Sequence, residues 1–254
     1  MQKLKNLTIL FILTTLFVVM GGLSPDVLAS PDAVAPNLGS AASFVGLAYS
    51  TLTNTGPGVF VGDVGAVSTG TSVTGFPPGT VRRGTIYMGG PVVALALTDA
   101  TTAYNALGGQ TCNVHLTGQD LGGMTLTPDV YCFDTSAQLT GDLVLDALGN
   151  PLAVWVFQTG STLTTASASS VGMINGGQAV NVFWQVGSSA TLGTTTRFSG
   201  NILALVSVTL TNGASLVGRA FGLTGAVTMD TTDAPAPISN TPLFEFCYLP
   251  LIMR

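Results

Sequence analysis

The chain has 254 residues, of which 46% are hydrophobic and 7% are charged, and its formal net charge is −5. The hydrophobic share is too high for a disordered chain. Lysine is absent beyond Lys5, so neither a basic patch nor a nucleic-acid partner is expected. A surface that avoids charge is unusual, and we expect it to have a task that charge would disturb.

The first 35 residues have the pattern of a secretory signal peptide. Lys3 and Lys5 precede an uncharged apolar run at 7–20, which is short for a membrane span. Small residues allow cleavage after Ala29 or after Ala35. We predict a signal peptide at 1–29, with 35 as the second cleavage site, and a secreted protein without membrane contact after cleavage. An uncleaved anchor is the alternative.

Segments 47–53 and 59–67 read as short strands separated by turn residues. A three-residue phrase then recurs along the chain: Thr, followed by Leu or Met, followed by a small or polar residue. It occurs at 51–53, 162–164, 191–193, 209–211 and 228–230. Residues after the phrase also align at a step of about 18, as Gly200 does with Gly218. A period near 20 residues without helical spacing indicates a β-solenoid.

The phrase also predicts which way its side chains point. Side chains alternate across a strand, so the central residues should face the core and their Thr neighbours the solvent. The predicted inward residues are Leu163, Leu192, Leu210 and Met229. Stacked strands would therefore carry parallel rows of outward Thr.

One segment, 92–107, has helical spacing instead. Leu97, Tyr104 and Leu107 fall on one face, and Pro91 suits the first turn of a helix. We predict one amphipathic helix that packs along the solenoid through these three residues. A further pair of strands is the alternative, and the Ala-rich composition of the segment disfavours it.

Two apolar runs, 153–157 and 182–186, should be strands buried on both faces. Their aromatic residues are assigned to the core rather than to a sugar-stacking platform. The strand pattern ends after residue 233. We therefore predict a solenoid domain at 36–233, followed at 234–254 by a linker and an apolar tail too short to span a membrane.

Three cysteines are present. Cys112 and Cys132 bracket a Gly-rich segment, and we predict a disulfide between them, with Cys247 left as a free thiol. Separated cysteines and the lone His115 do not have the spacing of a zinc site. A single His in a β-rich loop is more often a structural or surface residue than a catalytic base.

Many β-solenoids cleave polysaccharides with a pair of carboxylates. Asp142 and Asp146 share a predicted strand face, but four residues of strand separate them by about 13 Å. Glycoside-cleaving pairs lie roughly 5–9.5 Å apart, and Asp146 is better explained as a turn former. The sequence therefore predicts no enzyme, no metal ion and no cofactor.

Five motifs resemble those of the secreted microbial ice-binding proteins, a large antifreeze family, and they occur in its order. They are NLGSAASF (37–44), DLGGMTLTPDVY (120–131), VWVFQ (154–158), NGGQAVNVFWQVG (175–187) and GNILA (200–204). The resemblance covers about 36–232. It implies an all-β, right-handed discontinuous β-helix with a long helix alongside, and one flat face that binds ice.

The residues support the same function independently of the resemblance. Stacked strands repeat every 4.7–4.9 Å, close to a repeat distance of the ice lattice. Thr has a stiff χ1, which fixes its hydroxyl and its methyl group. We predict a monomer that adsorbs to ice crystals through a single flat face. The candidate residues are Thr51, Thr53, Thr162, Thr164, Thr191, Thr209, Thr211, Thr228 and Asp230.

Two other functions remain open at this point. A structural or adhesive cell-surface solenoid would use the Thr rows merely because Thr favours strands. A carbohydrate-binding module would need exposed aromatic residues and polar grooves, which the sequence does not show.

Overall fold

The computed structural model describes residues 33–230 and the backbone of 237–239. The predicted signal peptide at 1–29 lies outside the described residues. So does the predicted tail at 234–254, apart from 237–239.

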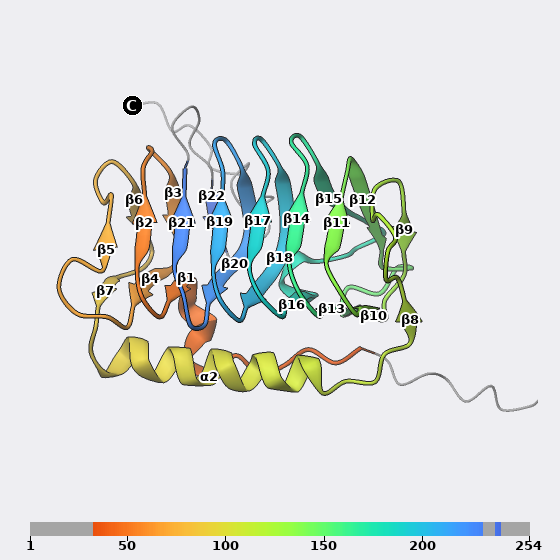
Figure 1. Ribbon diagram of the computed structural model, residues 1–254, viewed down its shortest axis with the longest axis horizontal. Coiled ribbons are helices and arrows are strands. Elements are labelled where there is room, and N and C mark those ends of the chain that lie inside the picture. Colours follow the sequence, from red (N-terminus) through yellow and green to blue (C-terminus); the bar gives the residue numbers. More distant parts are fainter. Residues whose placement is uncertain (1–32, 231–236, 240–254) are drawn as a thin grey trace, which may run out of the picture. The chain divides into compact units, whose positions relative to one another are not determined.

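The described chain is mostly β-structure, and its strands pair in parallel in two sheets. One sheet has seven short strands (Figure 1). In spatial order they are β11 (Ala137–Leu139), β14 (Leu163–Thr165), β17 (Ala190–Leu192), β19 (Val208–Leu210), β21 (Val227–Met229), β2 (Leu52–Asn54) and β5 (Val73–Thr74).

The 15-stranded sheet consists of two ladders that share β18 (Arg197–Ala204) and β20 (Ser215–Gly222). Around these two, the first ladder has β9 (Thr125–Leu126), β12 (Asp142–Asp146), β15 (Ser170–Ile174), β22 (Pro237–Ser239), β3 (Val59–Val61) and β6 (Thr80–Arg82). The second has β8 (Val114–His115), β10 (Val130–Phe133), β13 (Trp155–Thr159), β16 (Val182–Val186), β1 (Phe44–Ala48), β4 (Asp63–Ala66) and β7 (Ile86–Met88).

Glycines let β18 and β20 take part in both ladders. Gly200 and Gly218 are paired in register and have φ angles of 120° and 151°. Residues with a side chain rarely adopt these angles, and a Cβ at Gly218 would also collide with the carbonyl of Gly200. The step of 18 residues seen in the sequence is therefore the true register between these two strands.

The strand order departs from the chain order at one place. β21, the last strand of the seven-stranded sheet in the chain, pairs with β2, the first. Helix α2 (Pro91–Gly108) follows β7 at one end of the sheet, and β8 follows the helix at the other end (Figure 1). The helix thus carries the chain back along the sheets, so that later strands fill the space beside earlier ones.

A buried arginine lies at this junction. The guanidinium of Arg219 donates to the Ala42 carbonyl (Nη2, 2.7 Å) and to Oδ1 of Asn201 (Nη1, 2.8 Å). Burial lowers the pKa of Arg219 to about 10, so the group is still charged at neutral pH. Arg219 therefore connects the end of the repeating region to the segment that begins it.

The core between the sheets contains the two aromatic runs. Trp155, Phe157 and Trp184 are fully buried, and Phe157 stacks on Trp184 with ring centroids 3.9 Å apart. The prediction that these rings belong to the core is confirmed. Aromatic pairs of this kind contribute about 0.5–1.5 kcal/mol beyond the burial of their area.

The predicted helix is confirmed, with bounds one residue wider at each end. Leu97 and Leu107 are buried against the 15-stranded sheet, as predicted. Tyr104 is only half-buried, so it contributes less to this contact than predicted. Leu95, on the opposite face, is 55% exposed. Among the described residues no helix is long and apolar enough to cross a membrane.

One strand lies where a linker was predicted. Pro237–Ser239 form β22, which pairs with β20 on one side and β3 on the other. Three residues are too few to show alternation in a sequence. The position exists only because β20 and β3 leave a gap of one strand, and the sequence does not reveal that gap.

Two short 3₁₀ helices complete the described elements. η1 (Gly39–Ser43) precedes β1, and η2 (Ala179–Asn181) precedes β16.

Candidate functional site

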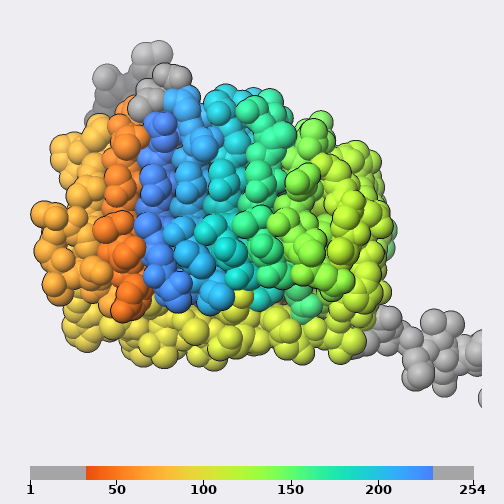
Figure 2. Space-filling model, viewed as in Figure 1, coloured from red at the N-terminus to blue at the C-terminus, as the bar shows by residue number. Residues whose placement is uncertain are grey.

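One row of outward side chains crosses the seven-stranded sheet from end to end. Figure 2 shows the strands as parallel bands across one broad face. The register places one residue of each strand beside the next, in the order Gln138, Thr164, Thr191, Thr209, Thr228, Thr53 and Thr74. We call these seven residues the central row. At the usual strand spacing the row is roughly 29 Å long.

Buried side chains in the same strands fix the position of the central row. In β14, β17, β19 and β21 a buried residue stands on each side of the central-row Thr. Leu163, Leu192, Leu210 and Met229 are all fully buried, as predicted. Because packed side chains fix the strands and χ1 of Thr is stiff, the outward groups are held in a regular array.

The register corrects the predicted rows at two positions. The repeated phrase aligned Thr162 and Thr51 with Thr191. The structure instead places in this row Thr164 and Thr53, which were candidates from the same two phrases. The offset is two residues. Since side chains alternate with a period of two, such an offset keeps a residue on the same face and moves it only along the strand.

The hydroxyl groups of the central row are available to an external partner. Those of Thr164, Thr191, Thr209 and Thr228 have no hydrogen-bond partner among the described residues. At the end of the row Thr74 donates to Oγ1 of Thr53, at 3.4 Å. Four neighbouring hydroxyls can therefore bind water or another ordered polar surface.

The flanking predicted residues are already engaged within the protein. Thr162 Oγ1 lies 2.8 Å from Ser136 Oγ, and Thr211 donates to a carbonyl of β17 at 2.8 Å. Asp230 accepts a hydrogen bond of 2.9 Å from Thr55. These residues lie beside the central row, and their hydrogen bonds join neighbouring parts of the chain. The bond from Thr55 satisfies part of the hydrogen-bonding capacity of the Asp230 carboxylate.

Sequence reasoning missed the two ends of the row. Thr74 belongs to a strand of two residues, and Gln138 does not fit the Thr phrase. The Val73-Thr74 pair was a usable signal, because an apolar residue precedes an outward Thr there as in Leu52-Thr53. Gln138 could be recognised only from its pairing with Thr164.

The profile of the ice-binding-like family matches residues 46–234, which include every strand of the central row. The chain belongs to the ice-binding-like family.

Individual relatives agree with this assignment. An ice-binding protein of Nostoc sp. (strain HG1) is 60% identical over 195 residues, which are 76% of this chain and 71% of the relative. One from Flavobacterium frigoris (strain PS1) is 32% identical over 217 residues, 79% of this chain and 76% of that protein. The crystal structure of an ice-binding protein from Antarctomyces psychrotrophicus has a TM-score of 0.76 and 37% identity, and covers 82% of this chain and all of that one.

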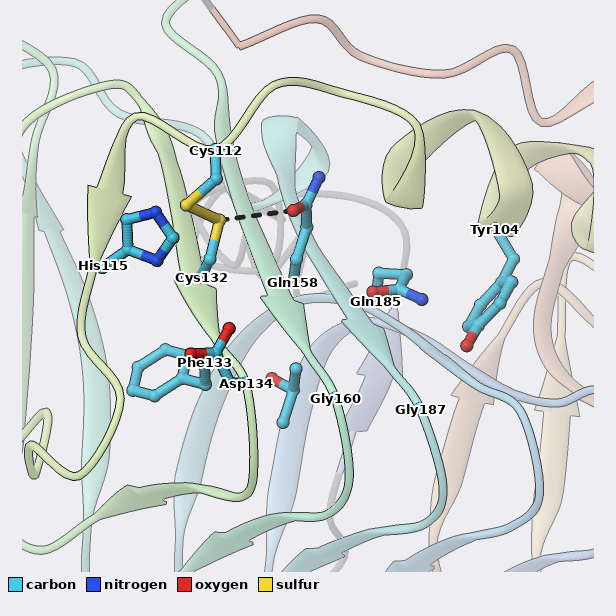
Figure 3. Close-up of a pocket in the computed structure, with 11 residues that line it drawn as sticks. Tyr104, Cys112, His115, Cys132, Phe133, Asp134, Gln158, Gly160, Gln185 and Gly187 are labelled. Atoms are coloured by element: carbon cyan, nitrogen blue, oxygen red, sulfur yellow. Dashed lines mark hydrogen bonds between the residues drawn. A yellow bond between two sulfur atoms is a disulfide. The ribbon is translucent and has the colours of Figure 1, made fainter.

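This member of the ice-binding-like family has the predicted disulfide. Cys112 and Cys132 are bonded, with their Cα atoms 5.9 Å apart. Oε1 of Gln158 lies 3.3 Å from Sγ of Cys132 (Figure 3). A disulfide sulfur has no proton to donate, so this is a contact and not a hydrogen bond. The bridge ties the segment after α2 to β10.

Removing the disulfide should lower stability without touching the central row. For a bridge that closes a loop of 20 residues, we expect the double change Cys112→Ser and Cys132→Ser to cost about 3 kcal/mol of unfolding free energy. Urea denaturation measures the loss. An unchanged midpoint, with the bridge verified by mass spectrometry in the parent protein, would show that the bridge does not stabilise the fold.

A shallow hollow beside the disulfide contains the only histidine (Figure 3). His115 is exposed there on β8, and Cys132, Gln158 and Gln185 occupy the paired positions of the next three strands. Burial raises the pKa of the Tyr104 hydroxyl, and the neighbouring side chain of Gln185 partly offsets this shift. No group of three His, Cys, Asp or Glu side chains within the described part of the chain is arranged to hold a metal ion.

The two aspartates considered as a catalytic pair have structural partners. Asp142 accepts a hydrogen bond of 2.6 Å from Ser170. Asp146 accepts from the backbone of Leu148 and from the amide of Asn175, at 2.9 and 2.8 Å. The two bonds of Asp146 fix the turn after β12, in agreement with the prediction that Asp146 forms a turn, whereas the bond of Asp142 joins the starts of β12 and β15.

Proposed function

We propose that this protein binds ice through the central row and inhibits the growth and recrystallisation of ice. The observation that carries the proposal is a straight row of Thr side chains, four of which have unpaired hydroxyls, on a rigid parallel sheet. Membership of the ice-binding-like family and the names of the relatives support the same function.

The chemistry of the row suits a crystalline water surface. Each hydroxyl can anchor one ordered water, and each methyl group leaves adjacent water free to form ice-like cages. The strand spacing repeats these groups every 4.7–4.9 Å, so many weak contacts stay in register with the lattice. Lys and Glu would bind liquid water and move, which explains why the face lacks them.

The proposed fold is a right-handed discontinuous β-solenoid over about 36–233. Three parallel ladders that the chain visits in turn, and the return along α2, support this architecture. Right-handed connections between parallel strands are the rule, because the twist of strands favours them. A rigid solenoid is the physical requirement for a binding face of fixed spacing.

The central experiment is thermal hysteresis of the purified protein, together with the shape of the ice crystals that grow in it. We expect a gap between melting and freezing temperatures, and faceted crystals. A folded protein that shows neither would favour the alternative of a structural or adhesive solenoid. The same result would remove the reason to regard the central row as a site.

We also propose that the protein is secreted as a monomer without enzymatic activity. The contacts of Val34 favour cleavage after Ala29 over the later site. Its N–H donates to Gln110 Oε1 at 2.9 Å, and its carbonyl accepts from Gln110 Nε2 at 2.8 Å. Cleavage after Ala35 would remove both hydrogen bonds.

Mass spectrometry of the exported protein tests this. We expect a mature chain that begins at Ser30, or at Pro36 if the later site is used. Full-length protein with Met1 retained in the soluble secreted fraction would contradict the prediction of a cleaved signal peptide.

A further inference from the structure

Three large apolar side chains are exposed together on loops far from the central row. Leu148 and Leu152, in the loop after β12, are 69% and 77% exposed, and Ile174 at the end of β15 is 45% exposed. We call these three residues the apolar corner. A hollow of about 440 Å³, lined in part by Leu148, Leu152 and Val154, lies beside them. Clusters of this kind usually mark a contact surface.

The backbone at Leu148 indicates that this exposure has a use. Leu148 has a φ angle of 52°, in the left-handed region, where a bulky residue is a genuine outlier. The next loop has Asn175 in the same conformation, with a φ angle of 53°, and the two turns are hydrogen-bonded through Gly149. Asn is the residue that suits this position. Leu pays the steric cost of this conformation whether or not its side chain is covered. Burial of that side chain against another segment would offset the cost.

The register brings the end of β22 to the level of this corner. Ser239 pairs with Val217, which pairs with Ser199 of β18. β18 pairs with β15 at Arg197 and Ser170. Continued by two residues, this register brings Ser199 level with Gly172, the partner of Val144. Val144 lies two residues before the end of β12. The C-terminal end of β22 therefore lies on the same side of the ladder as the C-terminal ends of β12 and β15, where the apolar corner is found.

The distance to the corner matches the length of the segment that follows. Three strand spacings, roughly 14 Å, separate β22 from β15, which carries Ile174, and a fourth spacing leads to β12. The four residues 240–243 can reach about 13 Å when extended, which is enough to bring residue 243 to the near side of the corner at Ile174. Residues 243–254 then read LFEFCYLPLIMR, with one acidic residue and a terminal Arg. Such a segment gains free energy when its apolar side chains are removed from water.

We propose that residues 243–254 pack against the apolar corner of their own chain, with an aromatic ring of the segment in the adjacent hollow. The N-terminal segment is a poorer occupant, because cleavage after Ala29 leaves only three residues before Ala33. This inference does not depend on the proposed ice binding, since the apolar corner and the central row share no residue.

Cross-linking in the full chain tests the proposal. Cys247 is the probe, and Leu152→Cys supplies its partner; Leu95→Cys, on the exposed face of α2, is the matched control. With a short bismaleimide we expect a product within one chain to form at least about tenfold faster for Leu152→Cys than for the control. Equal rates would overturn the proposal, and so would a product that links only two separate chains.

Thermal unfolding provides an independent readout. We expect Leu152→Ser to lower the Tm of the full chain by about 2–4 °C. It should leave the Tm of a chain ending at Asn240 unchanged, because the contact is already lost. Leu95→Ser should change neither protein. An equal shift for Leu152→Ser in both chains would show that the segment does not cover the corner.

Discussion

Thr209→Tyr is expected to abolish most of the thermal hysteresis while the protein remains folded. Thr209 lies in the middle of the central row, with three row residues on either side. A ring at this point would hold the face away from a crystal surface, and contacts would be lost along the whole row. The buried Leu210 beside it is unaffected, so circular dichroism and the Tm should stay near those of the parent protein.

Thr98→Tyr is the matched control for this prediction. Thr98 is exposed on α2, outside the central row, and its hydroxyl donates only to a carbonyl of its own helix. The same chemical change there should leave thermal hysteresis intact. If folded Thr209→Tyr protein keeps full activity, the central row is not the binding face, and another ladder has to be considered.

The contact between α2 and the sheet should give the largest effect on stability. Leu107 is fully buried in the cluster beneath the helix. Leu107→Ala leaves a cavity, and we expect a loss of about 2–5 kcal/mol in unfolding free energy. In a chain of this size, each kcal/mol lowers the Tm by roughly 2–4 °C. Calorimetry measures the shift directly.

Leu95→Ala is the comparison for Leu107→Ala, since both residues are Leu in the same helix. Leu95 is 55% exposed, and its loss should change stability by about 0.5 kcal/mol or less. Similar losses for the two variants would mean that α2 does not pack as described. Tyr104→Asp should cost less than a fully buried charge, because Tyr104 is half-buried and solvent screens the new carboxylate.

The repeating part of the fold could be predicted because its information is local. Alternation about Leu192, Leu210 and Met229 fixes which side chains point inward, and the step from Gly200 to Gly218 fixes a pairing between neighbouring strands. The helix was equally clear, since the spacing of Leu97 and Leu107 differs from that of a strand. These patterns required no knowledge of distant contacts.

Features that depend on distant contacts could not be predicted. The offset of Thr164 relative to Thr191 depends on how much chain the preceding corner uses, because both alignments keep Thr outward. The pairing of β2 with β21 joins segments at opposite ends of the domain, and β22 fills a gap that exists only in three dimensions. Thr53 was a candidate from the sequence, but its place between Thr228 and Thr74 and the membership of Thr74 itself were known only from the structure.

Partition into slowly growing ice tests the central row most directly, because it reports adsorption itself. Parent protein, Thr209→Tyr and Thr98→Tyr are each mixed separately with an equal amount of a protein that does not bind ice. A fraction of each solution is then frozen slowly. The ice should be enriched in the parent protein and in Thr98→Tyr, whereas Thr209→Tyr should remain in the liquid. Enrichment of folded Thr209→Tyr to the level of the parent would contradict a binding face centred on Thr209.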